Sequence, residues 1–390
     1  MVEYVNMKDK LIFLIKGQIA LFKQKKRDKN TWIFSSTDNS SFNYNSEYLF
    51  LYVRTYFKQV KPLFIINDEI KRKELQKEYG NEYFIETVSL KGMMQAMEAG
   101  VWITSAGLPV YAIGAGKDHI IINLWHGVPL KKIALMEENF SWLKKLYFKK
   151  LFSENYRFII TTSKKLIPIM SKSFGVDDKK IKVWGQPRND VLFDSTKWNK
   201  SISDFVDVDG YNKVILYAPT YRDYGNTKWF PFDDFDKKIL QKYLEEKGYL
   251  LCLRAHTEDG FENELCFCKN IVSVNADVIE DITEYLYMFD MLITDYSSIY
   301  IDYMLLNRPI IFLPYDKQEY LGKRGFNFEY DEVTPGLKPA TFKEFMLAVE
   351  SELVRDTLRS EREIINDYFN EVKEKCSKNI CEKIYEMRNF

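Results

Sequence analysis

Residues 119–132 read HIIINLWHGVPLKK, an apolar β-branched run that ends at a histidine, a glycine and a proline. Such a run predicts a buried strand of a parallel sheet, after which Gly127 and Pro129 turn the chain. Ligands of open α/β sheets bind beyond the carboxyl ends of the strands, so His126 lies where it can exchange a proton near neutral pH. The alternative is a histidine that only makes a hydrogen bond within a turn.

The size and charge of the chain restrict its class. Because 390 residues exceed one ordinary hydrophobic core, we expect two domains of similar size. Lys and Arg together number 56, as do Asp and Glu, and this zero net charge argues against a nucleic-acid partner. The five cysteines and three histidines lack the spacing of a zinc site, so we expect reduced cytoplasmic thiols and predict no metal site.

Short apolar runs alternate with longer helical patterns along most of the chain, which is typical of parallel, doubly wound sheets. The sequence therefore predicts an α/β, GT-B-like architecture, in which two Rossmann-like domains with parallel sheets face a central cleft and C-terminal helices follow. We expect a basic amphipathic segment at 1–29, one domain at 30–200, a second at 201–365 and a closing helix at 366–390. The expected strands are 31–35, 62–66, 101–104, 119–124, 157–161, 213–217, 249–254, 271–273, 291–294 and 309–313.

The amino-terminal segment combines two apolar runs, Leu11–Ile15 and Ile19–Phe22, with a cluster of basic residues up to Lys29. Such a segment can lie in the interface of an anionic membrane. The alternative is a helix that packs on its own domain and leaves a solvated basic tail. No stretch reaches the ~20 apolar residues of a membrane span, and the start of the chain lacks a signal-peptide cleavage pattern.

Several expected strands of the second half also end in polar residues. Arg254 and His256 follow one of them, and the guanidinium group is suited to phosphate oxygens. The run 294–298, Thr-Asp-Tyr-Ser-Ser, follows another and leads into a helical pattern. Ser297 and Ser298 would then begin a helix, where free N–H groups attract phosphate, although simple capping explains them as well. The turns at 220–222 and 323–326 add Thr220, Arg222 and Arg324.

Taken together, these motifs resemble those of the CDP-glycerol glycerophosphotransferase family, the teichoic acid primases and polymerases. The matching motifs run in the family's order over residues 100–340. Ala134 departs from the pattern, because the family often has glycine there. The motifs are WHGVPLKK at 125–132, GQPRND at 185–190, YAPTYR at 217–222, RAH at 254–256, the block ending in LITDYSS at 292–298, RG at 324–325 and PG at 335–336.

The resemblance implies a transferase of cell-wall synthesis with a CDP-alditol as donor, glycerol before ribitol, and no further cofactor. The acceptor would be a hydroxyl of an undecaprenyl-linked glycan or polymer, bound by the first domain, and the second domain would bind the donor. The enzyme would be cytoplasmic and peripherally attached to the anionic inner face of the membrane. The rival interpretations are a GT-B glycosyltransferase that uses a nucleotide sugar and a non-catalytic protein that binds a surface polymer.

The resemblance also assigns residue roles. His126 would be the general base, and His256 would help to hold the leaving diphosphate. The remaining matched residues would bind substrate: Trp125, Gly127, Pro129, Lys131, Arg188, Asn189, Thr220, Arg222, Arg254, Thr294, Asp295, Ser297, Ser298 and Arg324.

Overall fold

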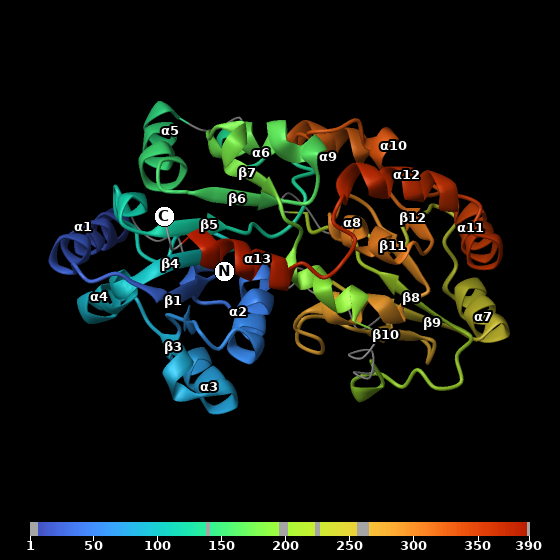
Figure 1. The fold of residues 1–390 in the computed structure, drawn as a ribbon. Helices are drawn as coiled ribbons and strands as arrows, with labels where there is room; N and C mark the ends of the chain where they lie inside the picture. Colours follow the sequence, from blue (N-terminus) through green and yellow to red (C-terminus); the bar gives the residue numbers. More distant parts are fainter. Residues whose placement is uncertain (1–6, 138–140, 195–201, 223–226, 256–264, 388–390) are drawn as a thin grey trace. The chain divides into compact units, whose positions relative to one another are not determined.

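The computed structural model of the chain describes residues 7–137, 141–194, 202–222, 227–255 and 265–387. It forms two compact units (Figure 1). Unit 1 comprises Met1–Asp190 and Glu371–Phe390, and unit 2 comprises Val191–Asn370. The chain therefore enters unit 2 once and returns to unit 1 for its last twenty residues.

Unit 1 is built on a parallel sheet of seven strands in the order β3-β2-β1-β4-β5-β6-β7. The strands are β1 (Asp28–Ser35), β2 (Lys61–Ile65), β3 (Phe84–Ile85), β4 (Ala99–Thr104), β5 (Ile120–Asn123), β6 (Phe158–Thr161) and β7 (Ile181–Val183). The helices are α1 (Met7–Lys23), α2 (Tyr44–Tyr56), α3 (Glu69–Tyr79), α4 (Leu90–Glu98), α5 (Trp142–Phe148), α6 (Ile167–Phe174) and α13 (Ser377–Glu386).

Unit 2 is built on a parallel sheet of five strands in the order β10-β9-β8-β11-β12. The strands are β8 (Lys213–Tyr217), β9 (Tyr249–Leu253), β10 (Ile271–Ser273), β11 (Met291–Thr294) and β12 (Ile310–Phe312). The helices are α7 (Lys237–Lys247), α8 (Ile299–Tyr303), α9 (Lys317–Arg324), α10 (Tyr330–Val333), α11 (Phe342–Arg355) and α12 (Arg359–Phe369).

Both sheets share the doubly wound order 3-2-1-4-5 in their first five strands, which confirms the predicted α/β fold class. In such sheets the order reverses at one point, and the crevice beyond the carboxyl ends of the strands there is the usual binding site. The reversal lies between β1 and β4 in unit 1 and between β8 and β11 in unit 2.

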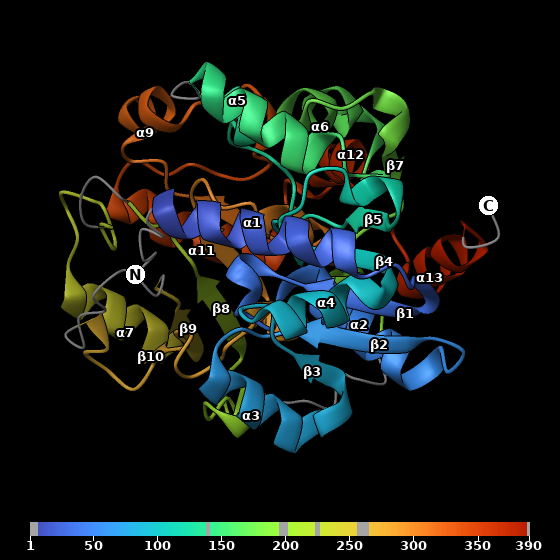
Figure 2. The same ribbon diagram turned by 90° about the vertical axis from the view of Figure 1, so that its left-hand side faces the viewer.

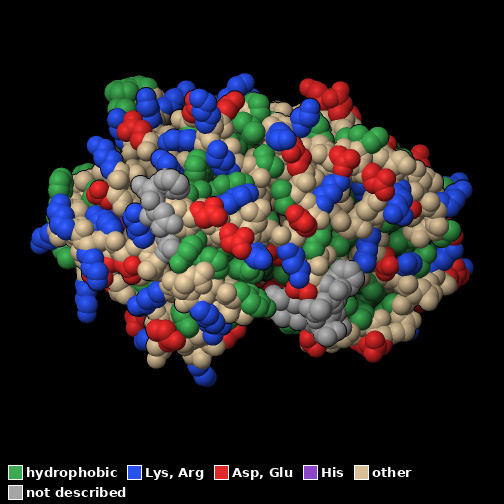
Figure 3. Space-filling model, in the orientation of Figure 1, with side chains coloured by type: hydrophobic (Ala, Val, Ile, Leu, Met, Phe, Trp, Pro, Cys, Tyr) green, Lys and Arg blue, Asp and Glu red, His purple; other side chains and the backbone are tan. Residues whose placement is uncertain are grey.

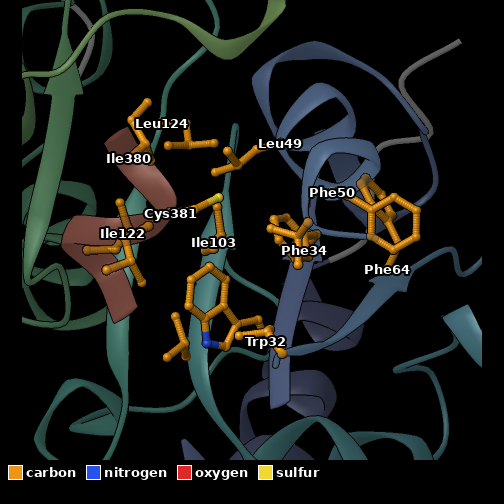
Figure 4. Packing of buried hydrophobic residues seen from close by; sticks show 14 of the residues in the cluster. Trp32, Phe34, Leu49, Phe50, Phe64, Ile103, Ile122, Leu124, Ile380 and Cys381 are labelled. Carbon is orange, nitrogen blue, oxygen red and sulfur yellow. The ribbon is translucent and has the colours of Figure 1, made fainter. Parts of the chain in front are cut away.

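One face of the unit 1 sheet is covered by α2 and α13, and their apolar side chains form a buried cluster (Figure 4). Side chains alternate along a strand, so Phe34 and Ile103 point into this cluster while Trp102 points to the opposite face. There, Trp102 Nε1 donates to the Ala96 carbonyl of α4 at 3.2 Å. Ile380 of α13 is fully buried against strand residues of unit 1, which explains why the end of the chain belongs to this unit.

The two closing helices belong to different units, whereas the sequence led us to expect one helix at 366–390. Helix α12 belongs to unit 2, where Arg362 is fully buried and donates to both Asp356 carboxylate oxygens, at 2.7 and 2.8 Å. The expected segment at 1–29 is part of unit 1, because α1 packs along its surface through Gly17, Ala20 and Leu21.

Gly17 provides a test of this packing. A Cβ at Gly17 would lie 2.2 Å from the Tyr111 carbonyl oxygen, so Gly17→Ala should destabilise the protein by about 1–3 kcal/mol in urea unfolding. Gly322 of α9 is the matched control, because nothing lies within 4 Å of a Cβ there. Gly322→Ala should be neutral or stabilise by up to about 1 kcal/mol through helix propensity alone. Equal stabilities for the two variants would show that α1 does not pack as described.

Candidate active site

The site of unit 1 lies beside the reversal point of its sheet, where the loops after β1, β4 and β5 meet. Ser105 follows β4, and its N–H donates to the Ser35 carbonyl of β1 at 3.1 Å. Leu124 follows β5 and donates to the Thr104 carbonyl at 2.7 Å. These two bonds continue the backbone hydrogen-bond ladder one residue beyond the strands. His126 comes two residues after Leu124, just past the end of β5.

His126 is held by a hydrogen bond from Nδ1 to the Ser105 carbonyl oxygen, at 2.9 Å. Because a carbonyl oxygen can only accept, Nδ1 carries the proton, and Nε2 of the neutral ring holds a lone pair. As a whole residue, His126 is half-buried. This arrangement is the one that a general base requires: one nitrogen fixed by the protein and the other available.

The surroundings of His126 favour the neutral ring. Burial lowers its pKa to about 4, and the nearby positive charge of Arg188 acts in the same direction, while the bond to the Ser105 carbonyl opposes them. Arg188 is held beneath the loop, where its Nη1 donates to the His126 carbonyl oxygen at 2.9 Å. At neutral pH the imidazole is therefore unprotonated.

Two aromatic rings pack against the imidazole. Trp125 lies 3.9 Å from it between ring centroids, and Tyr44 of α2 stacks on it at 5.0 Å with an interplanar angle of 26°. Trp125 has a left-handed backbone with φ of 54°, and Gly127 has φ of 150°. Ala134 has φ of 50°, a conformation that glycine adopts without strain.

Asn45 joins the loop after β5 to the loop after β7. It is fully buried in α2, and its Nδ2 donates to the Trp125 carbonyl at 2.8 Å. Its Oδ1 accepts from the Arg188 N–H at 3.1 Å. The sequence analysis missed Asn45, Ser105 and Tyr44, because none stands in a recognisable motif and each is brought to His126 only by the sheet order.

The structure also places the other predicted residues of unit 1. Gly127 is half-buried and Pro129 is buried in the turn after His126, with half-buried Lys131 two residues further on. Asn189 is buried beside Arg188 in the 3-10 helix Pro187–Phe193, and its N–H donates to the Gln186 carbonyl at 2.9 Å. The motifs at 125–132 and 185–190 therefore meet at one place.

In unit 2, Asp295 is the corresponding centre at the reversal point. Its Oδ1 accepts from Thr220, through N–H at 2.8 Å and Oγ1 at 2.5 Å, and from the Tyr296 N–H at 2.6 Å. Thr294, directly before it, donates through Oγ1 to the Ala218 carbonyl at 2.7 Å. These bonds fasten the loop after β8 to the loop after β11.

Arg222 adds to these bonds between the loops, and we call the whole set the unit 2 frame. Its side chain is 1% exposed, and it donates to Asp295 Oδ2 at 2.8 Å and to Asp316 Oδ2 at 2.7 Å. Burial alone would lower the pKa of Arg222, but the bonds to Asp316 and the charge of Asp295 outweigh it and raise the pKa above its ordinary value. The guanidinium also lies over the rings of Tyr296 and Tyr320, at 5.0 and 4.8 Å.

These bonds show what four residues predicted to bind substrate contact within the protein. Arg222, Asp295, Thr294 and Thr220 were predicted to bind substrate, yet the partners described above are protein atoms of the frame. Their side chains hold the loops together, because the buried polar groups at the ends of three parallel strands need hydrogen-bond partners there.

Arg254 also holds a loop. Its Nη1 donates to the Val274 and Ile279 carbonyls at 2.8 and 2.7 Å, and its Nη2 donates to the Glu280 carbonyl at 3.1 Å. Burial lowers the pKa of Arg254, and the carboxylates of Asp281 and Asp277 oppose that shift. Its predicted partner His256 lies outside the described residues.

The predicted serines begin α8. Ser297 Oγ accepts from the Ile299 N–H at 3.4 Å, whereas Ser298, at the N-cap position, makes no side-chain capping bond. Both are half-buried, and Arg324 is exposed at the end of α9. Among the described residues, no three His, Cys, Asp or Glu side chains are grouped so as to hold a metal ion.

The fold and these sites define a class: two-unit α/β proteins of GT-B-like architecture with a histidine at a strand end. A family model described as CDP-Glycerol:Poly(glycerophosphate) glycerophosphotransferase matches residues 18–386, and the chain belongs to this family.

The chain is similar to several proteins of teichoic acid synthesis. It is 29% identical over 362 residues to the teichoic acid poly(glycerol phosphate) polymerase of Bacillus subtilis (strain 168), covering 88% of this chain and 47% of that protein. It is 32% identical over 227 residues to the teichoic acid glycerol-phosphate primase of the same organism, covering 55% of each. This chain therefore spans about half the length of both relatives.

Among solved structures, the wall teichoic acid polymerase TagF has a similar fold. The TM-score is 0.79 at 22% identity, and the match covers 98% of this chain and 95% of that chain. At this identity the similarity supports the fold rather than the chemistry.

The histidine environment predicts a specific titration. His119 is 4% exposed, and burial also lowers its pKa to about 4, so both it and His126 should titrate near pH 4 in nitrogen-detected NMR. His126 should show the Nδ1–H tautomer. Because both folded-state pKa values lie below the ordinary 6.5, the unfolded chain binds more protons between pH 6.5 and 4. The free energy of unfolding should therefore fall as the pH is lowered through this window. A His126 midpoint near 6.5 would contradict the described burial.

Proposed function

We propose that this chain transfers an alditol phosphate, specifically glycerol phosphate, from a CDP-alditol to a hydroxyl of a membrane-anchored glycan lipid or polymer, with release of CMP. Membership of the glycerophosphotransferase family supports this proposal. So does the similarity to relatives named for glycerol-phosphate transfer. A TagF structure of a His→Asn variant soaked with CDPG also shares the fold, at a TM-score of 0.78.

The observation that carries the proposal is the state of His126: Nδ1 is fixed by Ser105, and Nε2 is unprotonated at neutral pH. In the proposed step, the acceptor hydroxyl attacks the phosphorus that bears the alditol and gives its proton to Nε2. The bond from that phosphorus to the bridging oxygen breaks, and its electrons leave with CMP.

For the donor, we propose that the turn at Ser297 and Ser298 binds the diphosphate. The half-buried serine hydroxyls and the first N–H groups of α8 supply donors of the kind that phosphate requires. Arg222 and Arg254 position the surrounding loops, through the carboxylates and carbonyls described above. From the family motif, we propose that His256 helps to hold the leaving diphosphate.

A test of the general base uses His126→Ala. The variant should release CMP about 10²–10⁴-fold more slowly than the wild type while keeping its thermal unfolding midpoint and its calorimetric affinity for CDP-glycerol. The assay combines CDP-glycerol or CDP-ribitol with a synthetic disaccharide-lipid acceptor and identifies products by mass spectrometry. Turnover within a few-fold of wild type would remove His126 from this role. Release of a nucleoside diphosphate from a nucleotide sugar would instead favour a glycosyltransferase.

We further propose that unit 1 attaches peripherally to an anionic membrane. Helix α1 buries one side on the unit and exposes the other, on which Leu11, Ile15 and Phe22 are 56%, 51% and 68% exposed. The exposed apolar side of α1 supports the proposed membrane contact. Among the described residues, no helix has the length and hydrophobicity needed to cross a bilayer.

Helix α5 extends this surface. Trp142 and Leu143 are 72% and 59% exposed, and Lys144 and Lys145 lie beside them. Figure 2 shows α1 and α5 on the same side of unit 1, both toward the viewer. In Figure 3, apolar and basic side chains are mixed along the edge of the unit where these helices lie. Apolar side chains flanked by lysines are the composition that binds an anionic interface.

Substitution of the exposed α1 residues tests this attachment. The triple change Leu11→Ser, Ile15→Ser and Phe22→Ser should reduce co-sedimentation with phosphatidylglycerol vesicles several-fold, because it removes apolar surface without touching the buried side of α1. Wild-type binding should weaken as salt rises, since each lysine near the surface contributes about 1 kcal/mol.

The matched control removes three exposed apolar side chains from unit 2, by Leu347→Ser, Val354→Ser and Ile364→Ser. This control should bind vesicles as well as the wild type. If both triple variants bind equally well, the membrane contact lies elsewhere.

A further inference from the structure

The loop between β1 and α2 is firmly tied to unit 1. Ser36 Oγ donates to Asn43 Oδ1, which links the two ends of the loop. In between, Asn39 Nδ2 donates to the Leu108 and Pro109 carbonyls at 3.0 and 3.2 Å. The loop therefore presents the first residue of α2 in a fixed place.

That first residue, Tyr44, has a strained backbone. Its φ is 59°, in the left-handed region that β-carbon sterics make unfavourable for bulky residues. Asp38 and Asn39 of the same loop share such values, but their short polar side chains tolerate the region. An aromatic residue in this conformation persists only where the surroundings enforce it, and such residues cluster at functional sites.

The consequence of this conformation is the position of the Tyr44 ring. It stacks on His126 at 5.0 Å between centroids and 26° between planes, while Trp125 packs against the same imidazole at 3.9 Å. The first turn of α2 also fixes the third contact, because the Ser46 N–H donates to Ser105 Oγ at 2.8 Å. The carbonyl of that serine accepts from His126 Nδ1.

We propose that Tyr44 is a positioning residue for the reaction: its ring, placed by a strained backbone, fixes the plane of the His126 imidazole and so the direction of Nε2. This inference rests on the proposed role of His126 as general base. The working part of Tyr44 is the ring face, because stacking uses the face and not the hydroxyl.

Three substitutions separate the ring from the backbone. Tyr44→Phe keeps the ring and should retain kcat within about threefold. Tyr44→Leu and Tyr44→Gly remove the ring and should both lower kcat about 10–100-fold, with an unchanged KM for CDP-glycerol. Because glycine adopts φ of 59° freely, Tyr44→Gly should unfold at a higher temperature than Tyr44→Leu. Low activity in the more stable variant is the result that a merely structural role does not produce.

A second measurement needs no substrate. With only three histidines in the chain, the His126 ring signal can be followed by NMR in wild type and variants. Arg188 is the charged group that acts on this ring, and it is unchanged in every variant. Loss of the ring admits water to the imidazole, so its midpoint should rise from about 4 toward 6.5 in Tyr44→Leu and Tyr44→Gly, but not in Tyr44→Phe.

The outcomes divide cleanly. Wild-type kcat and an unshifted His126 signal in Tyr44→Leu would overturn the proposal, as would a Tyr44→Phe variant as impaired as Tyr44→Leu. If the wild type does not turn over CDP-glycerol, the proposed function fails. In that event the NMR titration still decides whether Tyr44 holds the imidazole.

Discussion

Both units depend on the same constraint, the need to satisfy polar groups where parallel strands end at the reversal of sheet order. Helices depart to opposite faces there, and the backbone beyond the ladder loses its regular partners. In unit 1 a buried amide, Asn45, ties the loops after β5 and β7 together. In unit 2 a buried carboxylate, Asp295, ties the loop after β8 to its own.

The two solutions differ in their electrostatics. Asn45 is neutral and needs only hydrogen-bond partners, so it can be buried without a counter-charge. Asp295 requires a counter-charge, and Arg222 supplies it while also forming an ion pair with Asp316. Loss of one member of such a group strands a buried charge and is more costly than loss of a neutral bond. The unit 2 frame is thus intolerant of substitution.

In unit 1, by contrast, the side chain that joins the loops is the neutral Asn45. With a neutral frame, the charge that acts on His126 is that of Arg188, and together with burial it keeps the imidazole unprotonated. A lone pair on a fixed ring is then available for a hydroxyl proton. The aromatic rings of Tyr44 and Trp125 fix the orientation that hydrogen bonding at Nδ1 alone leaves free.

The sequence by itself determined most of the strands, their parallel direction and the motif residues. Runs such as 213–217 and 291–294 are apolar enough to specify strands with the bounds observed, whereas the short strands β3 and β7 were not expected from the sequence. His126 could be placed at a strand end because its position depends on local sequence. The protein contacts of Arg222 and Arg254 could not be predicted, because a guanidinium suits carboxylates and carbonyls as well as phosphate. Tyr44, Asn45 and Ser105 reach His126 only because the sheet order sets β4 between β1 and β5, and that adjacency is a property of the tertiary structure.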